Sequence, residues 1–170
     1  MNLDESDAQL HWTRWLDEHG WRLLAHARQL HSRPSDAEDL VQEVFLELWR
    51  NRTSEHPPDL PLALLKLRQR AIDQGRSSTR RAIREQGWQQ GYPDHVVPDL
   101  DLDQAHRMRI LQEALNQIPV SFREVISLKL WGELTFDQIG ELLEISRNTA
   151  ASRYRIALGR LKPLVQAIRP

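Results

Sequence analysis

The segment LTFDQIGELLEISRNTAASRYRIALGRLK at residues 134–162 decides how the C-terminal part of the chain folds. Thr135 and Gln138 have the spacing of a capping box, in which two side chains satisfy the free amides at the start of a helix. A short turn follows at 144–146, and its Ser146 is suited to cap a second helix. Helix, short turn and second helix is the arrangement that sets a recognition helix into the major groove of DNA. The segment therefore predicts a helix-turn-helix.

The second helix of this motif has an apolar side and a polar side. Its apolar residues recur at helical spacing and are expected to face inward; they are Ala150, Tyr154, Ala157, Leu158 and Leu161. On the polar side, Arg offers a bidentate donor fork to guanine, Asn can pair with adenine, and Ser can reach a base or a phosphate. The residues expected to face the groove are Arg147, Asn148, Ala151, Ser152 and Arg155.

Apolar residues recur at three- and four-residue spacing along the rest of the chain, which predicts an all-α protein. Two further capping boxes, Ser35 with Glu38 and Ser121 with Glu124, mark expected helix starts. Helices are expected over 8–30 with an interruption at Gly20, over 35–50, from 62 into the 70s with a break at 77–78, over 108–118, and from 121 to about 132. In the third of these, Leu64, Leu65, Ala71 and Ile72 are expected on one side.

The helical pattern is lost between about 85 and 104, where Gly, Pro and four Asp residues gather. This predicts two small helical domains, at 1–88 and 105–170, joined by a flexible acidic linker at 89–104. The C-terminal domain contains the helix-turn-helix.

Composition excludes several classes of function for the 170-residue chain. The absence of Cys excludes a disulfide framework, a thiolate nucleophile and a Cys-based zinc site. The seven His lack metal-ligand spacing, and no Gly-rich phosphate loop or nucleophile elbow is present, so neither a metal, a cofactor nor an enzymatic activity is expected. No secretory signal and no run of about eighteen apolar residues is found, so no membrane insertion is expected.

Charge is strongly segregated, although 23 Lys plus Arg nearly balance 24 Asp plus Glu. Basic residues crowd segments 66–84 and 146–170, whereas acids crowd 36–47 and 94–103. A charged run is usually a solvated face, but two basic segments in separate helical modules favour DNA binding. Because the acidic segments offset the basic ones to a net charge of -1, we expect the chain alone to bind DNA only weakly.

Three segments resemble the bacterial sigma factors of the sigma-70 family. The segment DAEDLVQEVFLELWR at 36–50 resembles their core-binding helix. The segment LRQRAID at 67–73 resembles the one that precedes their helix for melting and reading the minus-ten element. Residues 134–162 resemble their terminal helix-turn-helix. The short chain, with only a linker between its modules, resembles the extracytoplasmic-function (group four) subfamily. The resemblance spans residues 8–165, approximately, and implies that 1–88 is region two and 105–170 is region four. It also implies that the chain is a non-enzymatic specificity subunit that brings core RNA polymerase to promoters and helps to open them.

The resemblance also implies which residues bind which partner. The contacts with core polymerase, on the clamp coiled coil of its largest subunit, are Asp36, Asp39, Gln42, Glu43 and Glu47. The apolar stripe of their helix is expected to pack inside the domain. This leaves an acidic face that is expected to bind a basic partner. The minus-ten contacts are Arg68, Gln69, Arg70, Asp73, Arg76, Arg80 and Arg81. The minus-thirty-five contacts are Arg147, Asn148, Thr149, Ala151, Ser152, Arg153 and Arg155. Further implications are a contact with the polymerase flap, an anti-sigma factor, a monomeric free chain and a cytoplasmic location.

The chain departs from the family pattern at several positions. Asn148, Ala150 and Ile156 stand where Gly, Val and Arg are frequent, and Gln69 replaces a frequent Asn. No aromatic residue lies between Trp49 and Trp88, so flipped bases would be held in polar pockets and not by aromatic stacking.

Three alternatives stay open on the residues alone. Asp73 is equally suited to be a structural partner of a neighbouring Arg. The whole chain could be a dimeric helix-turn-helix regulator that works without polymerase, although such a protein has no need of the acidic 36–47 face. It could also be a sigma-like antagonist that titrates polymerase without opening promoters.

Overall fold

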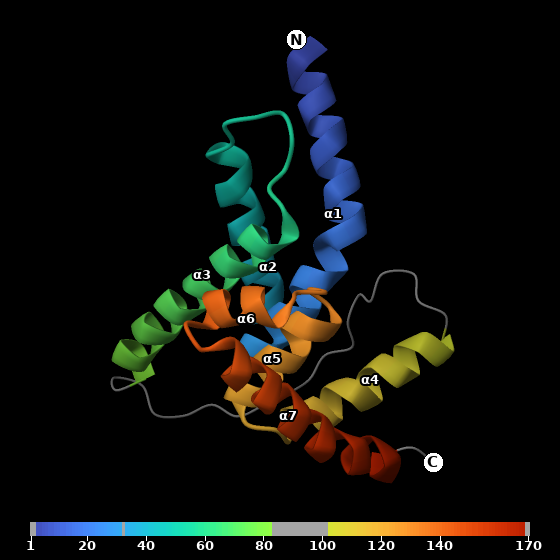
Figure 1. Ribbon diagram of the computed structural model, residues 1–170. Helices are drawn as coiled ribbons and strands as arrows, with labels where there is room; N and C mark the ends of the chain where they lie inside the picture. Colours follow the sequence, from blue (N-terminus) through green and yellow to red (C-terminus); the bar gives the residue numbers. More distant parts are fainter. Residues whose placement is uncertain (1–2, 32, 83–101, 169–170) are drawn as a thin grey trace. The chain divides into compact units, whose positions relative to one another are not determined.

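The computed structural model describes residues 3–31, 33–82 and 102–168, with side chains described at 6–31, 33–75, 107 and 109–167. The described residues form seven α-helices and no strand, which confirms the prediction of an all-α chain (Figure 1). The chain divides into two compact units, Met1–His95 and Val96–Pro170. Most of the predicted acidic linker lies outside the described residues, and its limits stay a prediction.

The first unit is a three-helix bundle of α1 (Leu3–Leu30), α2 (Pro34–Arg50) and α3 (Leu60–Ala82), each of which packs against the other two. Its core is assembled from one apolar stripe per helix, because residues three and four apart share a helix face. An aromatic cluster closes one end, where the Trp12 ring meets the rings of Phe45 and Trp49 edge-on, at centroid distances of 5.7 and 5.2 Å. The buried stripes include Leu23 and Ala27 of α1, Leu40 and Val44 of α2, and Leu64 and Leu67 of α3.

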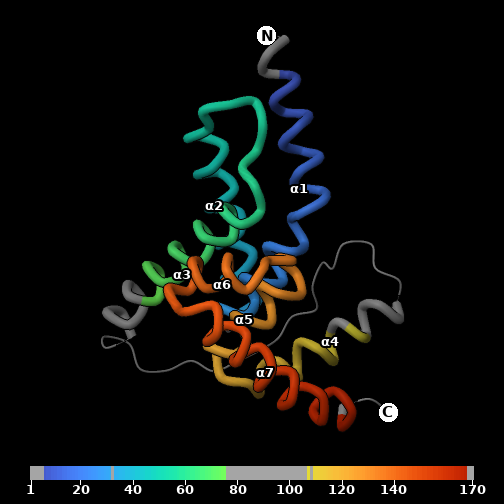
Figure 2. The backbone as a smooth tube through the Cα atoms, viewed as in Figure 1, coloured from blue at the N-terminus to red at the C-terminus, as the bar shows by residue number. Residues whose placement is uncertain are grey.

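Helix α1 winds without a break from Leu3 to Leu30, so the interruption expected at Gly20 is wrong (Figure 2). One Gly in a helix interior costs only about 1 kcal/mol, which the buried residues on either side of it offset. Similarly, α3 runs to Ala82, so the break expected at 77–78 is wrong. Its predicted apolar side is incomplete, since Ile72 is exposed.

The capping box predicted from Ser35 and Glu38 is also wrong. Helix α2 begins one residue earlier, at Pro34, and its N-cap is Arg33, whose side chain makes no capping hydrogen bond. Proline is favoured in the first turn of a helix because its φ is already helical and it has no amide hydrogen to satisfy. The local preference of Pro34 thus overrides the capping signal that follows it.

The second unit contains α4 (Leu102–Asn116), α5 (Val120–Leu130), α6 (Phe136–Leu143) and α7 (Arg147–Ile168). Helix α7 packs against the other three helices of this unit. Leu115, Ile126, Leu128 and Ile139 are completely buried at the centre. This unit therefore holds its two shortest helices, α5 and α6, in place through contacts with α7.

Two of the predicted features of the second unit need correction. Helix α5 starts at Val120 with Pro119 as its N-cap, so the capping box of Ser121 and Glu124 does not form. Leu158, expected to face inward, is 39% exposed, whereas Ala150, Ala157 and Leu161 are buried as expected. None of the helices in the described part of the chain is long and apolar enough to cross a membrane.

Candidate nucleic-acid and polymerase interfaces

Helices α6 and α7 form a helix-turn-helix with a very close turn. Glu144 ends α6 in the left-handed conformation, with φ 57° and ψ 42°, and the Ile145 amide donates to the Gly140 carbonyl over 2.9 Å. A Cβ on Gly140 would lie 2.7 Å from the Ile145 carbonyl oxygen and 3.4 Å from the Arg147 nitrogen. Only glycine permits this approach, which sets the start of α7 against the middle of α6.

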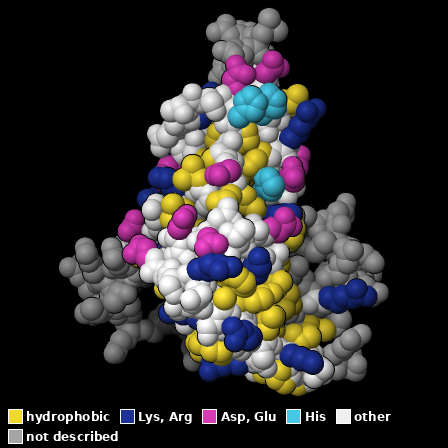
Figure 3. All heavy atoms as spheres, in the orientation of Figure 1, with side chains coloured by type: hydrophobic (Ala, Val, Ile, Leu, Met, Phe, Trp, Pro, Cys, Tyr) yellow, Lys and Arg dark blue, Asp and Glu magenta, His cyan; other side chains and the backbone are white. Residues whose placement is uncertain are grey.

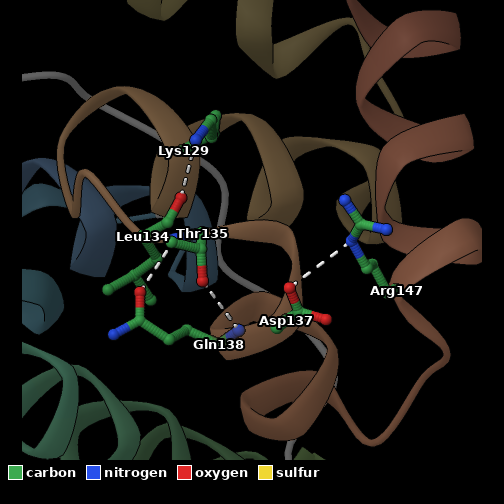
Figure 4. A network of polar contacts seen from close by, with 6 residues as sticks. All are labelled: Lys129, Leu134, Thr135, Asp137, Gln138 and Arg147. Carbon is green, nitrogen blue, oxygen red and sulfur yellow. Dashed lines mark hydrogen bonds and ion pairs between the residues drawn. The ribbon is translucent and has the colours of Figure 1, made fainter.

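The start of α6 is held by the capping box that the sequence predicts. The Thr135 hydroxyl accepts from the Gln138 amide over 3.2 Å, and the Gln138 side chain accepts from the Thr135 amide over 2.8 Å (Figure 4). Lys129 of α5 adds a hydrogen bond of 2.9 Å from its Nζ to the Leu134 carbonyl, just before the cap. The sequence reasoning missed this role of Lys129; the signal was a basic residue in the last turn of a predicted helix.

The start of α7 is capped by Ser146, as predicted. Its Oγ accepts from the Thr149 amide over 3.0 Å and lies 2.8 Å from the Thr149 hydroxyl. The Thr149 hydroxyl, one of the predicted DNA contacts, is therefore engaged in the cap, and its side chain is half-buried.

The remaining predicted minus-thirty-five residues divide by exposure. Arg147, Asn148, Ser152 and Arg155 are exposed, whereas Ala151 and Arg153 are half-buried. Positions 148, 152 and 155 share one face of a helix, opposite the buried Ala150 and Ala157. Tyr154 lies at the edge of the core, with its ring 5.6 Å from that of Phe136. In Figure 3, Lys and Arg side chains are interleaved with hydrophobic ones where α6 and α7 lie.

In the first unit, two of the predicted polymerase-binding acids already have a basic partner within the chain. Glu43 Oε2 accepts from Arg70 Nε and from Gln74 Nε2, each over 3.0 Å, and Glu47 lies 3.7 Å from Lys66 Nζ. The expectation that this whole acidic face lacks a partner is therefore wrong for Glu43 and Glu47. The hydrogen bond to Glu43 and the charge of its carboxylate raise the pKa of Arg70 above its ordinary value.

The other predicted polymerase contacts are more available. Asp39 and Gln42 are exposed on α2, and Asp36 is half-buried. Within the described residues, neither Asp36 nor Asp39 takes part in an ion pair.

The predicted minus-ten residues of α3 also lie in different environments. Gln69, Arg70 and Asp73 are exposed, whereas Arg68 is half-buried. The core histidine His26 is completely buried, and its pKa is lowered to about 3, first by burial and second by the positive charge of Arg68. Arg68 thus belongs partly to the interior of the bundle. Arg76, Arg80 and Arg81 continue α3, but their side chains lie outside the described residues.

Family comparisons agree with the division into two modules. Residues 15–81 match the model of Sigma-70 region 2, and residues 108–161 match that of Sigma-70, region 4. The ECF RNA polymerase sigma factor SigK of Mycobacterium tuberculosis (strain H37Rv) is 30% identical over 132 residues, which cover 74% of this chain and 70% of SigK. This chain belongs to the extracytoplasmic-function (ECF) sigma factors of the sigma-70 family. SigK of Mycobacterium ulcerans is 29% identical over 137 residues, or 77% of this sigma factor and 73% of SigK.

Two solved structures share the fold of this sigma factor. The sigma factor RpoE of Bartonella quintana, in complex with the anti-sigma factor NepR, superposes with a TM-score of 0.72 at 22% identity, covering 91% of this chain and 96% of RpoE. CnrH, in complex with the cytosolic domain of CnrY, superposes with a TM-score of 0.59 at 16% identity, covering 98% of this chain and 99% of CnrH. At these identities the likeness concerns the fold alone.

The family membership confirms the resemblance to ECF sigma factors, and it confirms a non-enzymatic function in transcription initiation. The region 2 match includes α2 and nearly all of α3, and the region 4 match includes the helix-turn-helix. The individual contact residues stay predictions, and they form the proposal below.

Proposed function

We propose that this sigma factor works through three surfaces: α2 binds core RNA polymerase, α3 contacts the minus-ten element, and the start of α7 reads the minus-thirty-five element. The observation that carries the proposal is the arrangement of exposed and buried side chains in the first turn of α7. Its first turn presents Arg147 and Asn148 to solvent, while Ala150 in the same turn is completely buried. Exposed side chains that can read bases thus stand at the start of a helix that is anchored in the core through Ala150.

The minus-thirty-five surface consists of base-reading and phosphate-binding parts. Arg147, Asn148 and Ser152 suit base edges in the major groove, because Arg and Asn make bidentate contacts there. Arg155, two turns along the helix, and the half-buried Arg153 suit the phosphates on either side. Ala151 is small enough to let the backbone approach the groove, and Thr149 contributes through the cap that positions Arg147 and Asn148.

The polymerase surface is centred on Asp39 and Gln42, with Asp36 beside them. Asp39 is a better first contact than Glu43, because a basic group of the polymerase clamp coiled coil can approach Asp39 without displacing Arg70. Glu43 and Glu47 join the contact by exchanging their partners in α3 for basic groups on the polymerase.

The minus-ten surface is formed by Gln69, Arg70 and Asp73, the exposed members of the predicted set. Arg76, Arg80 and Arg81 extend it along α3. We assign Arg68 a supporting role, because it is half-buried beside His26. The basic residues hold the melted strand by its phosphates, and polar pockets take the place of aromatic stacking.

We further propose that this sigma factor is a cytoplasmic monomer when free, that it also contacts the polymerase flap, and that an anti-sigma factor sequesters it. The last point is supported by the two proteins of the same fold, RpoE and CnrH, whose structures contain NepR and the cytosolic domain of CnrY.

Two variants separate the polymerase surface from the DNA surface. Asp39→Lys reverses an exposed charge of α2 that has no ion-pair partner in the described residues, and it should weaken binding to core polymerase at least tenfold. Asp17→Lys, the same change at an exposed position of α1, is the control and should leave binding unchanged. Arg155→Ala should spare polymerase binding and reduce transcription from the cognate promoter. Identical effects of Asp39→Lys and Arg155→Ala would refute the assignment of separate surfaces.

A further inference from the structure

We propose that Asp137 determines the base selectivity of the recognition helix by positioning Arg147; this rests on the proposed role of α7 in reading the minus-thirty-five element. Asp137 is the second residue of α6, and Arg147 is the first residue of α7. The turn brings them together, so that Arg147 Nε lies 3.4 Å from Asp137 Oδ2 (Figure 4). Asp137 itself contacts no base and acts only through Arg147.

Asp137 and Arg147 both line an open hollow of about 440 Å³ between α6 and α7. Gly140, Glu141 and Glu144 also line it. In the described residues, only Asp137 among these three acids forms an ion pair with Arg147. Of these acids, Asp137 forms the ion pair with Arg147, and Glu141, on the same helix, provides a matched comparison.

The atoms involved leave the base-reading end of Arg147 available. The ion pair reaches Nε, so the two terminal amino groups of the guanidinium are left for a pair of acceptors such as O6 and N7 of guanine. When α7 is docked on DNA, a carboxylate that holds one edge of the guanidinium restricts where its other edge can point, and so favours one base pair over the others.

The pair contributes little until DNA is bound. The side chains of Arg147 and Asp137 are 66% and 68% exposed, and ion pairs in water at such exposure are weak. Docking of α7 in a groove excludes water and strengthens the attraction. At the same time, the carboxylate repels nearby phosphates and so opposes DNA binding of any sequence. Asp137 is thus expected to lower general affinity while it raises discrimination between sequences.

These opposite effects separate positioning from a merely structural role. The experiment uses core polymerase loaded with the full-length sigma factor and measures binding to promoter fragments in which each minus-thirty-five base pair is varied in turn. For Asp137→Asn, we expect binding to mismatched fragments to increase, and discrimination at one base-pair position to fall about tenfold. For Glu141→Gln, the control that removes the same charge one helical turn away, we expect binding to increase without loss of discrimination.

A double-mutant comparison tests whether Asp137 acts through Arg147. Arg147→Gln should abolish discrimination at the same position, and Asp137→Asn added to it should cause no further loss. Unchanged discrimination in Asp137→Asn, or the same loss in Glu141→Gln, would overturn the inference while the proposed function stands. Absence of any base preference in the wild-type protein would overturn the inference and the proposed role of α7 together.

Discussion

Glu43 of α2 accepts a hydrogen bond of 3.0 Å from Arg70 of α3, across a gap of 27 residues in the sequence. This contact joins the helix that we assign to core polymerase with the helix that we assign to the minus-ten element. The Glu43 and Arg70 side chains are 45% and 48% exposed, so water and salt reach both charges. The contact can therefore break at small cost when either partner meets a stronger one.

We expect the pair to contribute little to stability. Glu43→Gln, Arg70→Gln and the double variant should give a coupling energy below about 1 kcal/mol in urea unfolding, because exposed ion pairs of this kind fall in that range. The coupling should shrink further at high salt. A salt-independent coupling above about 2 kcal/mol would show instead that the pair is a structural part of the bundle.

His26 should make the stability of the first unit depend on pH. Its pKa in the folded chain is about 3, lowered mainly by burial, so the unfolded chain, with an ordinary pKa of about 6.5, takes up the proton more readily. The contribution of His26 to the free energy of unfolding is therefore fully present above pH 6.5. It is lost as the pH falls toward 3, by up to about 1.4 kcal/mol per pH unit.

The measurement is urea unfolding at pH 7, 6 and 5 for the wild type and His26→Leu. The slope of unfolding free energy against pH should be flatter in the variant, whatever its absolute stability. Val44→Ala, which removes buried apolar atoms of the same bundle and no titratable group, is the control and should keep the wild-type slope. Equal slopes in all three proteins would contradict the assignment.

Gly140 should be intolerant of a side chain. Gly140→Ala places a Cβ 2.7 Å from a backbone oxygen, which cannot move without opening the turn between α6 and α7, and should destabilise the second unit by about 1–3 kcal/mol. Gly159→Ala is the matched control, because nothing lies within 4 Å of its added Cβ and the site is helical; it should stabilise by about 0.5–1 kcal/mol. Thermal unfolding of both variants decides the matter, and destabilisation by both would remove the steric explanation.

Local signals account for most of the features that the sequence predicted correctly. Thr135 and Gln138 satisfy each other within one helical turn, so their pattern can be recognised without tertiary information. The same pattern does not form a capping box at Ser35, because the helix already begins at Pro34. The helix-turn-helix was likewise predictable, because both of its caps lie within a dozen residues.

The relationships that the sequence could not predict are contacts between helices. The partners of Glu43 and the burial of His26 depend on how α1, α2 and α3 pack, which no local pattern encodes. Asp137 and Arg147 are ten positions apart, but their ion pair depends on the angle that Gly140 permits between two helices. The predicted site residues thus lie on helices that the sequence predicted, whereas their exposure and their partners within the chain required the structure.

This sigma factor directs core RNA polymerase to specific promoters. The most direct measurement is transcription by purified core polymerase on a library of promoter fragments, with and without the protein. We expect transcripts from a distinct subset of fragments only when the protein is present, and we expect their loss with Arg155→Ala. Binding to core polymerase without any promoter-dependent transcript would contradict it and would identify the chain as a sigma-like antagonist.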